Sequence, residues 1–159
     1  MNNILILGST SNICKIRVFN NLNSIHHLIN KIYCFCNKNL TTKKFVNYIN
    51  NSVTINRANM INYKINYING EYNLDSYITN LSHILKSNTI IYVSTPPICY
   101  NDIIDFIKLS KVDCKLILEK PLSLNLAEFK LLKPKLNKNI SMIDHFLYKN
   151  CIVNCRAPS

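Results

Sequence analysis

Acidic residues and long apolar runs are both scarce in this sequence. Only 8 Asp and Glu oppose 19 Lys and Arg, which leaves a formal charge of +11 on 159 residues. No apolar run approaches the roughly 20 residues that a helix needs to cross a bilayer, which predicts a soluble protein. The positive charge favours anionic ligands, but no base-stacking aromatic motif accompanies the lysines, which argues against nucleic acid as a partner.

The cysteines lack the arrangement that a disulfide framework or a zinc site requires. Seven of them, an odd number, are scattered along the chain, and no secretory segment precedes them. Cys34 and Cys36 are two apart in "KIYCFCN" and would share one face of a strand as packing residues. Cys151 and Cys155 are four apart, yet no nearby Cys or His pair completes a zinc pattern. The sequence therefore predicts reduced thiols, a cytoplasmic location and no metal.

Short apolar runs alternate with segments of helical spacing. Hydrophobic residues make up 48% and charged residues 17%, so the chain can bury enough surface to fold. Its 159 residues suit one domain with a core and are too few for two comfortable ones. Strands are expected at 3–8, 31–36, 67–70, 89–97, 115–121 and 139–146, and helices at 9–22, 40–49, 74–85, 99–111 and 123–136, with 51–66 as loop. Thr41 or Thr42 would cap the second helix, and Pro134 would break the last.

This alternation predicts an α/β fold, a Rossmann-like doubly wound domain with a mainly parallel sheet. Several strands are continuous apolar runs, as in parallel sheets covered on both faces. The domain would span residues 1–150, leaving 151–159 as a tail without a second domain. Ligands of such sheets bind at the carboxyl ends of the strands. Five strand ends would converge there: Gly8, Asn37, Pro96-Pro97, Glu119-Lys120-Pro121 and Asp144-His145.

The first strand end, "GSTSNIC", keeps the spacing of a dinucleotide fingerprint, although only Gly8 remains a glycine. Ser11 adds a hydroxyl where the phosphate would lie, while the backbone N–H groups of the helix start would remain. Asn37 and Lys38 end the second strand, where NAD-binding proteins usually carry an acid. A lysine there suits a 2′-phosphate, which favours NADP over NAD. The alternatives are a turn that binds nothing and a solvated Lys38.

Two further strings end strands in charged residues. In "LILEKP", Lys120 leaves the core where an ammonium could hold substrate oxygens or a carboxamide, and Pro121 fits a cis peptide bond. In "IDHFLYK", Asp144, His145 and Lys149 place a carboxylate, an imidazole and an ammonium together, which suits a phosphoryl group. On chemistry alone, a surface Glu-Lys pair and a structural histidine remain the competing interpretations.

Taken in order, these strings resemble the glucose-6-phosphate dehydrogenase family over about residues 4 to 150. The strings are "GSTSNICKIR", "YINGEY", "YVSTPPICY", "LILEKPLSLNL" and "IDHFLYK". The resemblance implies an NADP-dependent oxidoreductase of glucose metabolism that converts glucose 6-phosphate to 6-phosphogluconolactone in the pentose phosphate pathway. The family's cofactor is NADP, with NAD as the second choice, and the substrate is a sugar phosphate.

The resemblance also assigns roles to individual residues. The cofactor would contact Gly8, Ser9, Thr10, Ser11, Asn37, Lys38, Tyr100 and Lys120. The sugar phosphate would contact Lys120, His145 and Lys149, and the residues assigned to catalysis would be Lys120 and Asp144.

The sequence departs from the family pattern at several of these positions. Ser11 and Asn12 replace a Gly-Asp pair, and Asn37 replaces the arginine that reads the 2′-phosphate. The family's general-base histidine belongs to a second domain that this chain does not reach, which implies a truncated form of low activity or a partner chain that supplies the missing half. Sugar and inositol oxidoreductases of the Gfo/Idh/MocA type share the Glu-Lys-Pro strand end and are the second choice. A non-catalytic basic binding module on the same fold is the third.

Overall fold

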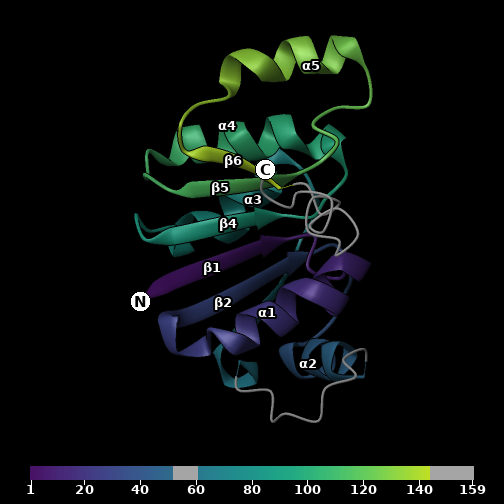
Figure 1. The fold of residues 1–159 in the computed structure, drawn as a ribbon, viewed down its shortest axis with the longest axis vertical. Coiled ribbons are helices and arrows are strands. Elements are labelled where there is room, and N and C mark those ends of the chain that lie inside the picture. The colour runs from purple at the N-terminus through teal and green to yellow at the C-terminus, as the bar shows by residue number, and fades with distance from the viewer. Residues whose placement is uncertain (52–60, 144–159) are drawn as a thin grey trace, which may run out of the picture.

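Six parallel strands form one sheet with helices on both faces in the computed structural model, which describes residues 1–51 and 61–143 (Figure 1). The strand order is β3-β2-β1-β4-β5-β6, and each neighbouring pair is parallel. The order reverses between β1 and β4, which is the crevice where doubly wound folds bind their ligands. The predicted α/β Rossmann-like sheet is therefore confirmed. The strands are β1 (Asn2–Leu7), β2 (Ile29–Cys36), β3 (Ile65–Asn69), β4 (Thr89–Val93), β5 (Lys115–Glu119) and β6 (Ile140–Ile143).

Five α-helices and several short turns of other helix types connect these strands in the described residues. The α-helices are α1 (Phe19–Ser24), α2 (Thr42–Asn50), α3 (Leu74–Leu81), α4 (Tyr100–Ser110) and α5 (Leu126–Leu132). A π-helix precedes α1 at Cys14–Val18, and 3-10 turns lie at His26–Leu28, Asn62–Lys64, Ser82–Ile84, Pro97–Cys99 and Lys133–Lys135. None of the helices in the described ranges is long and apolar enough to cross a membrane.

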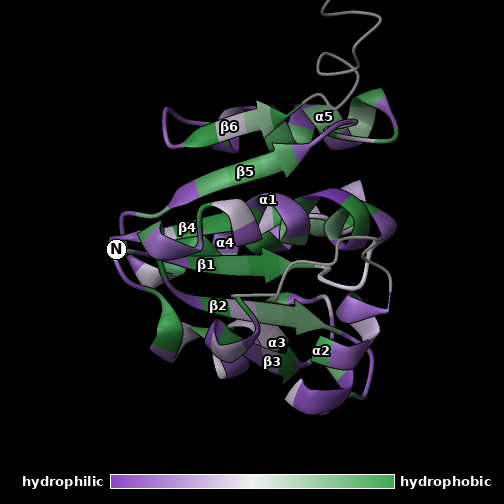
Figure 2. Ribbon diagram, turned by 60° about the horizontal axis from the view of Figure 1, so that its bottom comes forward, coloured by the Kyte–Doolittle hydropathy of each residue, from purple (hydrophilic) through white to green (hydrophobic). Residues whose placement is uncertain are grey.

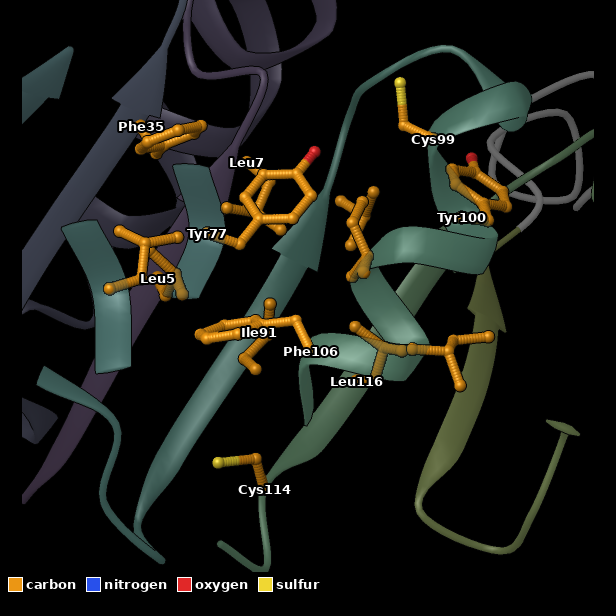
Figure 3. Packing of buried hydrophobic residues seen from close by; sticks show 14 of the residues in the cluster. Leu5, Leu7, Phe35, Tyr77, Ile91, Cys99, Tyr100, Phe106, Cys114 and Leu116 are labelled. Carbon is orange, nitrogen blue, oxygen red and sulfur yellow. The ribbon is translucent and has the colours of Figure 1, made fainter. Parts of the chain in front are cut away.

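Each face of the sheet has its own hydrophobic core. Phe19 of α1 and Phe45 of α2 pack with Cys34 on one face, with the two rings 5.9 Å apart in an edge contact. On the other face, Tyr77 of α3 and Phe106 of α4 pack over the middle strands, as Figure 3 shows. Since both faces are covered, β1 and β5 are apolar along most of their length, as Figure 2 shows.

Local signals placed several helix ends correctly. The Thr41 side chain accepts a hydrogen bond from the Lys44 N–H and so caps α2, as predicted. The last helix turns into a 3-10 turn at Lys133–Lys135, which confirms the break expected near Pro134. The loop expected at 51–66 is wrong at its end, because Ile65 already pairs with β2. The strand expected at 67–70 is therefore present but begins two residues earlier, at Ile65. Residues 52–60 of the expected loop lie outside the described residues.

Candidate nucleotide site

The turn after β1 packs directly against the end of β4. Gly8 has a φ of +80°, and a Cβ there would lie 2.4 Å from the Ser94 carbonyl oxygen. The Ser94 N–H in turn donates a 2.8 Å hydrogen bond to the Leu7 carbonyl. Both the backbone conformation and the close approach exclude any side chain at this position. The tight turn expected from the fingerprint spacing is therefore present at the point where the strand order reverses.

The next two residues turn their side chains toward β2. Ser9 is fully buried, and its hydroxyl lies 3.4 Å from the Phe35 carbonyl oxygen. Thr10 is half-buried, with its hydroxyl 3.0 Å from the Cys36 sulfur. These contacts hold the turn against the sheet. Of the two residues, only Thr10 is exposed enough to contact a cofactor.

Ser11 occupies the position where the fingerprint has its second glycine. Its hydroxyl accepts a 3.1 Å hydrogen bond from the Cys14 N–H and lies 2.7 Å from the Ser94 hydroxyl. The Ser11 hydroxyl thus caps the N-terminal end of the following helix. A backbone N–H that fingerprint proteins leave for the pyrophosphate is already used by the protein itself.

The end of β2 presents two exposed polar residues beside a buried thiol. Asn37 and Lys38 are exposed, where the ribose of a dinucleotide would lie. Burial opposes ionisation of Cys36, but hydrogen bonds from the Thr10 and Tyr72 hydroxyls outweigh it and lower the pKa of the thiol. Cys36 is only 1% exposed. The thiol therefore holds Thr10 and Tyr72 together below the surface that Asn37 and Lys38 form.

Two residues that sequence reasoning had missed lie at the same edge. Tyr48 of α2 donates a 3.0 Å hydrogen bond to the Thr10 carbonyl, and the Lys15 ammonium lies 3.6 Å from its ring centroid. The Lys38 ammonium lies 5.4 Å from the same centroid. No sequence motif links Tyr48 with Lys15 or Thr10. The sequence signal for this contact was limited to Lys15 itself, a basic residue in the first helical turn after the fingerprint.

The ends of β4 and β5 are joined by hydrogen bonds below Lys120. Tyr92 donates a 2.6 Å bond to the Glu119 carboxylate, and Tyr100 donates a 3.0 Å bond to the Glu119 carbonyl. Lys120 is exposed, and its bond to Pro121 is cis, as predicted. Tyr100, expected near a cofactor, is 1% exposed and belongs to the core (Figure 3). Its contact with Glu119 makes it a support of the Lys120 segment.

The structure thus brings Gly8, Ser11, Lys38 and Lys120 to the carboxyl edge of one sheet. Asp144, His145 and Lys149 lie outside the described residues. Within the described ranges, no group of three His, Cys, Asp or Glu side chains could hold a metal ion. A pocket of about 240 Å³ lies at the opposite edge, where β5 and β6 begin, and so plays no part in this site.

Comparisons with known proteins agree with this arrangement. The sequence model of the glucose-6-phosphate dehydrogenase NAD binding domain matches residues 5–154. No curated protein matches the chain. Among solved structures, glucose-6-phosphate 1-dehydrogenase from Mycobacterium avium superposes with a TM-score of 0.78 at 16% identity. A glucose-6-phosphate dehydrogenase in complex with its substrate glucose-6-phosphate gives a TM-score of 0.77 at 19% identity.

The two superpositions cover 96% of this chain, but only 41% and 38% of the neighbouring chains. At these identities they show a shared fold, while the match of the family model extends over almost the whole sequence. The chain therefore belongs to the glucose-6-phosphate dehydrogenase family and corresponds to its NAD binding domain.

Proposed function

We propose that this domain binds NADP across the carboxyl ends of β1, β2 and β5. The observation that carries the proposal is the Gly8 turn, which places a left-handed glycine against Ser94 at the reversal of strand order. Lys38 at the end of β2 takes the place of the acid that would accept a ribose hydroxyl from NAD. Gly8, Thr10 and Ser11 would face the cofactor phosphates.

The remaining residues take the roles that the resemblance gives them. Lys120 would contact both the cofactor and the substrate, and Asn37 would lie beside the 2′-phosphate. Ser9 and Tyr100 would act from below, because both are buried and hold the turn and the Lys120 segment in place. In a complete enzyme, His145 and Lys149 would hold the sugar phosphate, with Asp144 beside them as a catalytic residue.

The reaction proposed for the complete enzyme is the oxidation of glucose 6-phosphate to 6-phosphogluconolactone. A hydride leaves the anomeric carbon for the nicotinamide ring, a base removes the proton of the anomeric hydroxyl, and the carbon–oxygen double bond of the lactone forms. Because the chain spans about two fifths of its structural neighbours, we propose that the base comes from the remainder of the enzyme or from a partner chain.

An NADP titration of the purified chain, followed by calorimetry, tests the proposal. Lys120→Ala should weaken NADP binding by about tenfold, since an ammonium that contacts the cofactor contributes roughly 1.5 kcal/mol. Lys115→Ala is the matched control, because Lys115 is exposed at the opposite end of β5. Equal affinities of the two variants, or no NADP binding by the wild type, would contradict the proposal.

A second experiment tests the need for the remaining part of the enzyme. The purified chain with NADP and glucose 6-phosphate should produce no NADPH absorbance. Addition of a fragment carrying the part of a glucose-6-phosphate dehydrogenase that lies beyond the matched region should produce it. Ordinary turnover by the chain alone would overturn this part of the proposal.

The charge of +11 favours one alternative, a basic module that binds nucleic acid. If that alternative holds, the chain should bind nucleic acid tightly, and the affinity should fall steeply as the salt concentration rises. Lys120→Ala should then leave the affinity for nucleic acid unchanged.

A further inference from the structure

The pocket at the amino edge of the sheet has an apolar interior. It lies between the end of α4 and the starts of β5 and β6, on the edge opposite the Gly8 turn. Its apolar lining consists of Ile104, Ile107, Val112, Cys114, Leu116 and Ile140. Ile104 and Leu116 are each 2% exposed, and Leu116 lies beside Cys114 near the start of β5 (Figure 3). An apolar group of a ligand would therefore be well buried here.

The pocket has a volume of about 240 Å³. An engineered apolar cavity of about 150 Å³ in another protein holds one benzene molecule. By this comparison the pocket suits an apolar body with a polar head, of roughly ten non-hydrogen atoms in all.

The mouth of the pocket carries more positive than negative charge. Two exposed lysines, Lys108 and Lys111, line it together with one exposed acid, Asp113. The Asp113 carboxylate accepts a 2.5 Å hydrogen bond from the Asn139 amide. Within residues 1–51 and 61–143, neither lysine ammonium forms an ion pair or a hydrogen bond. One net positive charge therefore remains at the mouth, which matches a single negative charge on a ligand.

Several hydrogen-bond acceptors at the mouth already have donors. The Ile107 carbonyl accepts a 2.7 Å bond from the Ser110 hydroxyl, and the Lys108 carbonyl accepts a 3.2 Å bond from the Lys111 N–H. The side-chain oxygen of Asn137 accepts a 2.9 Å bond from the Asn139 N–H. The two ammonium groups remain as donors for a ligand, and donors of this kind bind a carboxylate by charge-assisted hydrogen bonds.

Lys111 has an unfavourable backbone conformation for a lysine. It follows the last residue of α4 with a φ of +55°, and it is the only non-glycine residue with a positive φ in the described ranges. Glycine is the usual residue at this position of a helix end, since a Cβ disfavours the left-handed conformation. The chain thus carries a lysine at the mouth of the pocket where the backbone favours glycine.

We propose that this pocket binds a small monocarboxylate. Its apolar body would fill the space between α4 and the starts of β5 and β6, and its carboxylate would lie between the ammonium groups of Lys108 and Lys111. The site is separate from the dinucleotide site, because the two lie at opposite edges of the sheet. The inference therefore does not depend on the proposed function.

A titration of the purified chain with 3-phenylpropanoate, followed by NMR of the backbone amides, tests the site. The signals of Val112, Cys114 and Ile140 should shift, whereas that of Gly8 should not. The uncharged 3-phenylpropanamide has nearly the same shape and should bind about fivefold more weakly, because it lacks the charge. Saturating NADP should leave the affinity for 3-phenylpropanoate unchanged.

Three results would overturn the proposal. They are equal affinities for the acid and the amide, no binding of the acid up to about 10 mM, and displacement of the acid by NADP.

Lysine variants test the proposed contacts with the carboxylate. Lys108→Met and Lys111→Gly should each reduce the preference for the acid over the amide by about twofold, and the double variant should remove it. Lys130→Met is the matched control, because Lys130 is likewise an exposed lysine in the last turn of a helix, and it should keep the preference. An unchanged preference in the double variant would overturn the role of the lysines.

Lys111→Gly separates binding from folding. Glycine relieves the backbone at a φ of +55°, so the melting temperature should rise by about 2–4 °C while the preference for the acid falls. A variant that unfolds at a lower temperature than the wild type would contradict this account of Lys111.

Val112→Phe tests the apolar part of the pocket. Val112 is half-buried in the wall, and a phenyl ring there would occupy the space. The affinities for the acid and the amide should both fall by about tenfold, since the pocket is closed to either compound. Thermal unfolding shows that the variant is folded. Wild-type affinity for the acid in the folded variant would place the probe outside the pocket and overturn the proposal.

Discussion

The hydroxyl of Tyr92 lies 2.6 Å from a carboxylate oxygen of Glu119, so a buried hydrogen bond links β4 to β5 directly before Lys120. Burial, together with the hydrogen bond to Glu119 and the charge of its carboxylate, raises the pKa of Tyr92 far above its ordinary value. The tyrosine therefore remains a donor at every ordinary pH. Glu119 is 9% exposed, and a carboxylate at that depth requires donors.

Tyr92→Phe removes this donor and should lower the free energy of unfolding by about 1.5–3 kcal/mol, the range for hydrogen bonds to charged groups. The comparison variant is Tyr100→Phe, because Tyr100 donates to the uncharged Glu119 carbonyl across 3.0 Å. That loss should cost only about 0.5–1.5 kcal/mol. Urea unfolding of both variants measures the difference. If Tyr100→Phe lowered the free energy of unfolding as much as Tyr92→Phe does, the charge on Glu119 would not be what makes the Tyr92 hydrogen bond strong.

Gly8→Ala should destabilise the domain by at least about 2 kcal/mol. Its φ of +80° disfavours any side chain, and the new Cβ would lie 2.4 Å from the Ser94 carbonyl oxygen, so β1 and β4 would have to separate at their ends. Thermal unfolding with and without NADP is the measurement. Asn12→Ala, an exposed change in the next turn, should be nearly neutral. A Gly8→Ala protein of normal stability would mean that the turn can relax away from β4.

Ser11→Gly should move stability and cofactor affinity in opposite directions. The Ser11 hydroxyl accepts from the Cys14 N–H, and glycine would free that donor for a phosphate while removing the cap. NADP should therefore bind several-fold more tightly, while the free energy of unfolding falls by about 0.5–1 kcal/mol. Ser11→Ala removes the cap without making room and serves as the control. If both variants bind NADP alike, the added space contributes nothing, and if neither binds NADP more tightly than the wild type, the freed N–H contributes nothing either.

Features that depend on neighbouring residues were predictable from the sequence. Three residues show this, because each specifies its local structure and is placed as expected. Thr41 caps the start of α2, Pro134 lies where the last helix changes to a 3-10 turn, and Pro121 follows a cis peptide bond after β5. The alternation of apolar runs and helical segments likewise specified the parallel sheet, because each element carries its own periodicity.

The orientation of side chains at the strand ends was not predictable in the same way. Strand positions show that Ser9 and Tyr100 reach the carboxyl edge, but the twist of each turn determines which way they point, and both point into the protein. The pairing of Lys15 with Tyr48 depends on packing of α2 against the first turn, which no local pattern encodes. The residues of the π-helix at Cys14–Val18 show ordinary helical spacing, so the sequence pattern predicted a helix there without its type.

The fully buried Cys14 thiol should make the domain lose stability in base. Burial raises the pKa of Cys14 from 9.0 to about 11, so the unfolded chain releases this proton at a lower pH than the folded chain does. The stabilisation from Cys14 is therefore complete below pH 9.0 and declines until about pH 11. Two pH units correspond to about 3 kcal/mol. Other buried thiols and tyrosines with raised pKa values, such as Cys114, add to the decline.

Urea unfolding at several pH values between 8 and 11, in the presence of a reductant, measures this slope. Cys14→Ser replaces the thiol with a group that does not ionise, so its free energy of unfolding should decline by about 3 kcal/mol less over the window than that of the wild type. Cys36→Ala is the control, because the pKa of Cys36 is lowered rather than raised, so its ionisation opposes the decline that a raised pKa causes. Its contribution to stability rises as the pH approaches the unfolded pKa of 9.0 and is then constant, so removing Cys36 should not lessen the decline between pH 9.0 and about 11. Equal slopes in Cys14→Ser and the wild type would show that the folded protein lets Cys14 ionise, and hence that water reaches the interior between the Gly8 turn and β4.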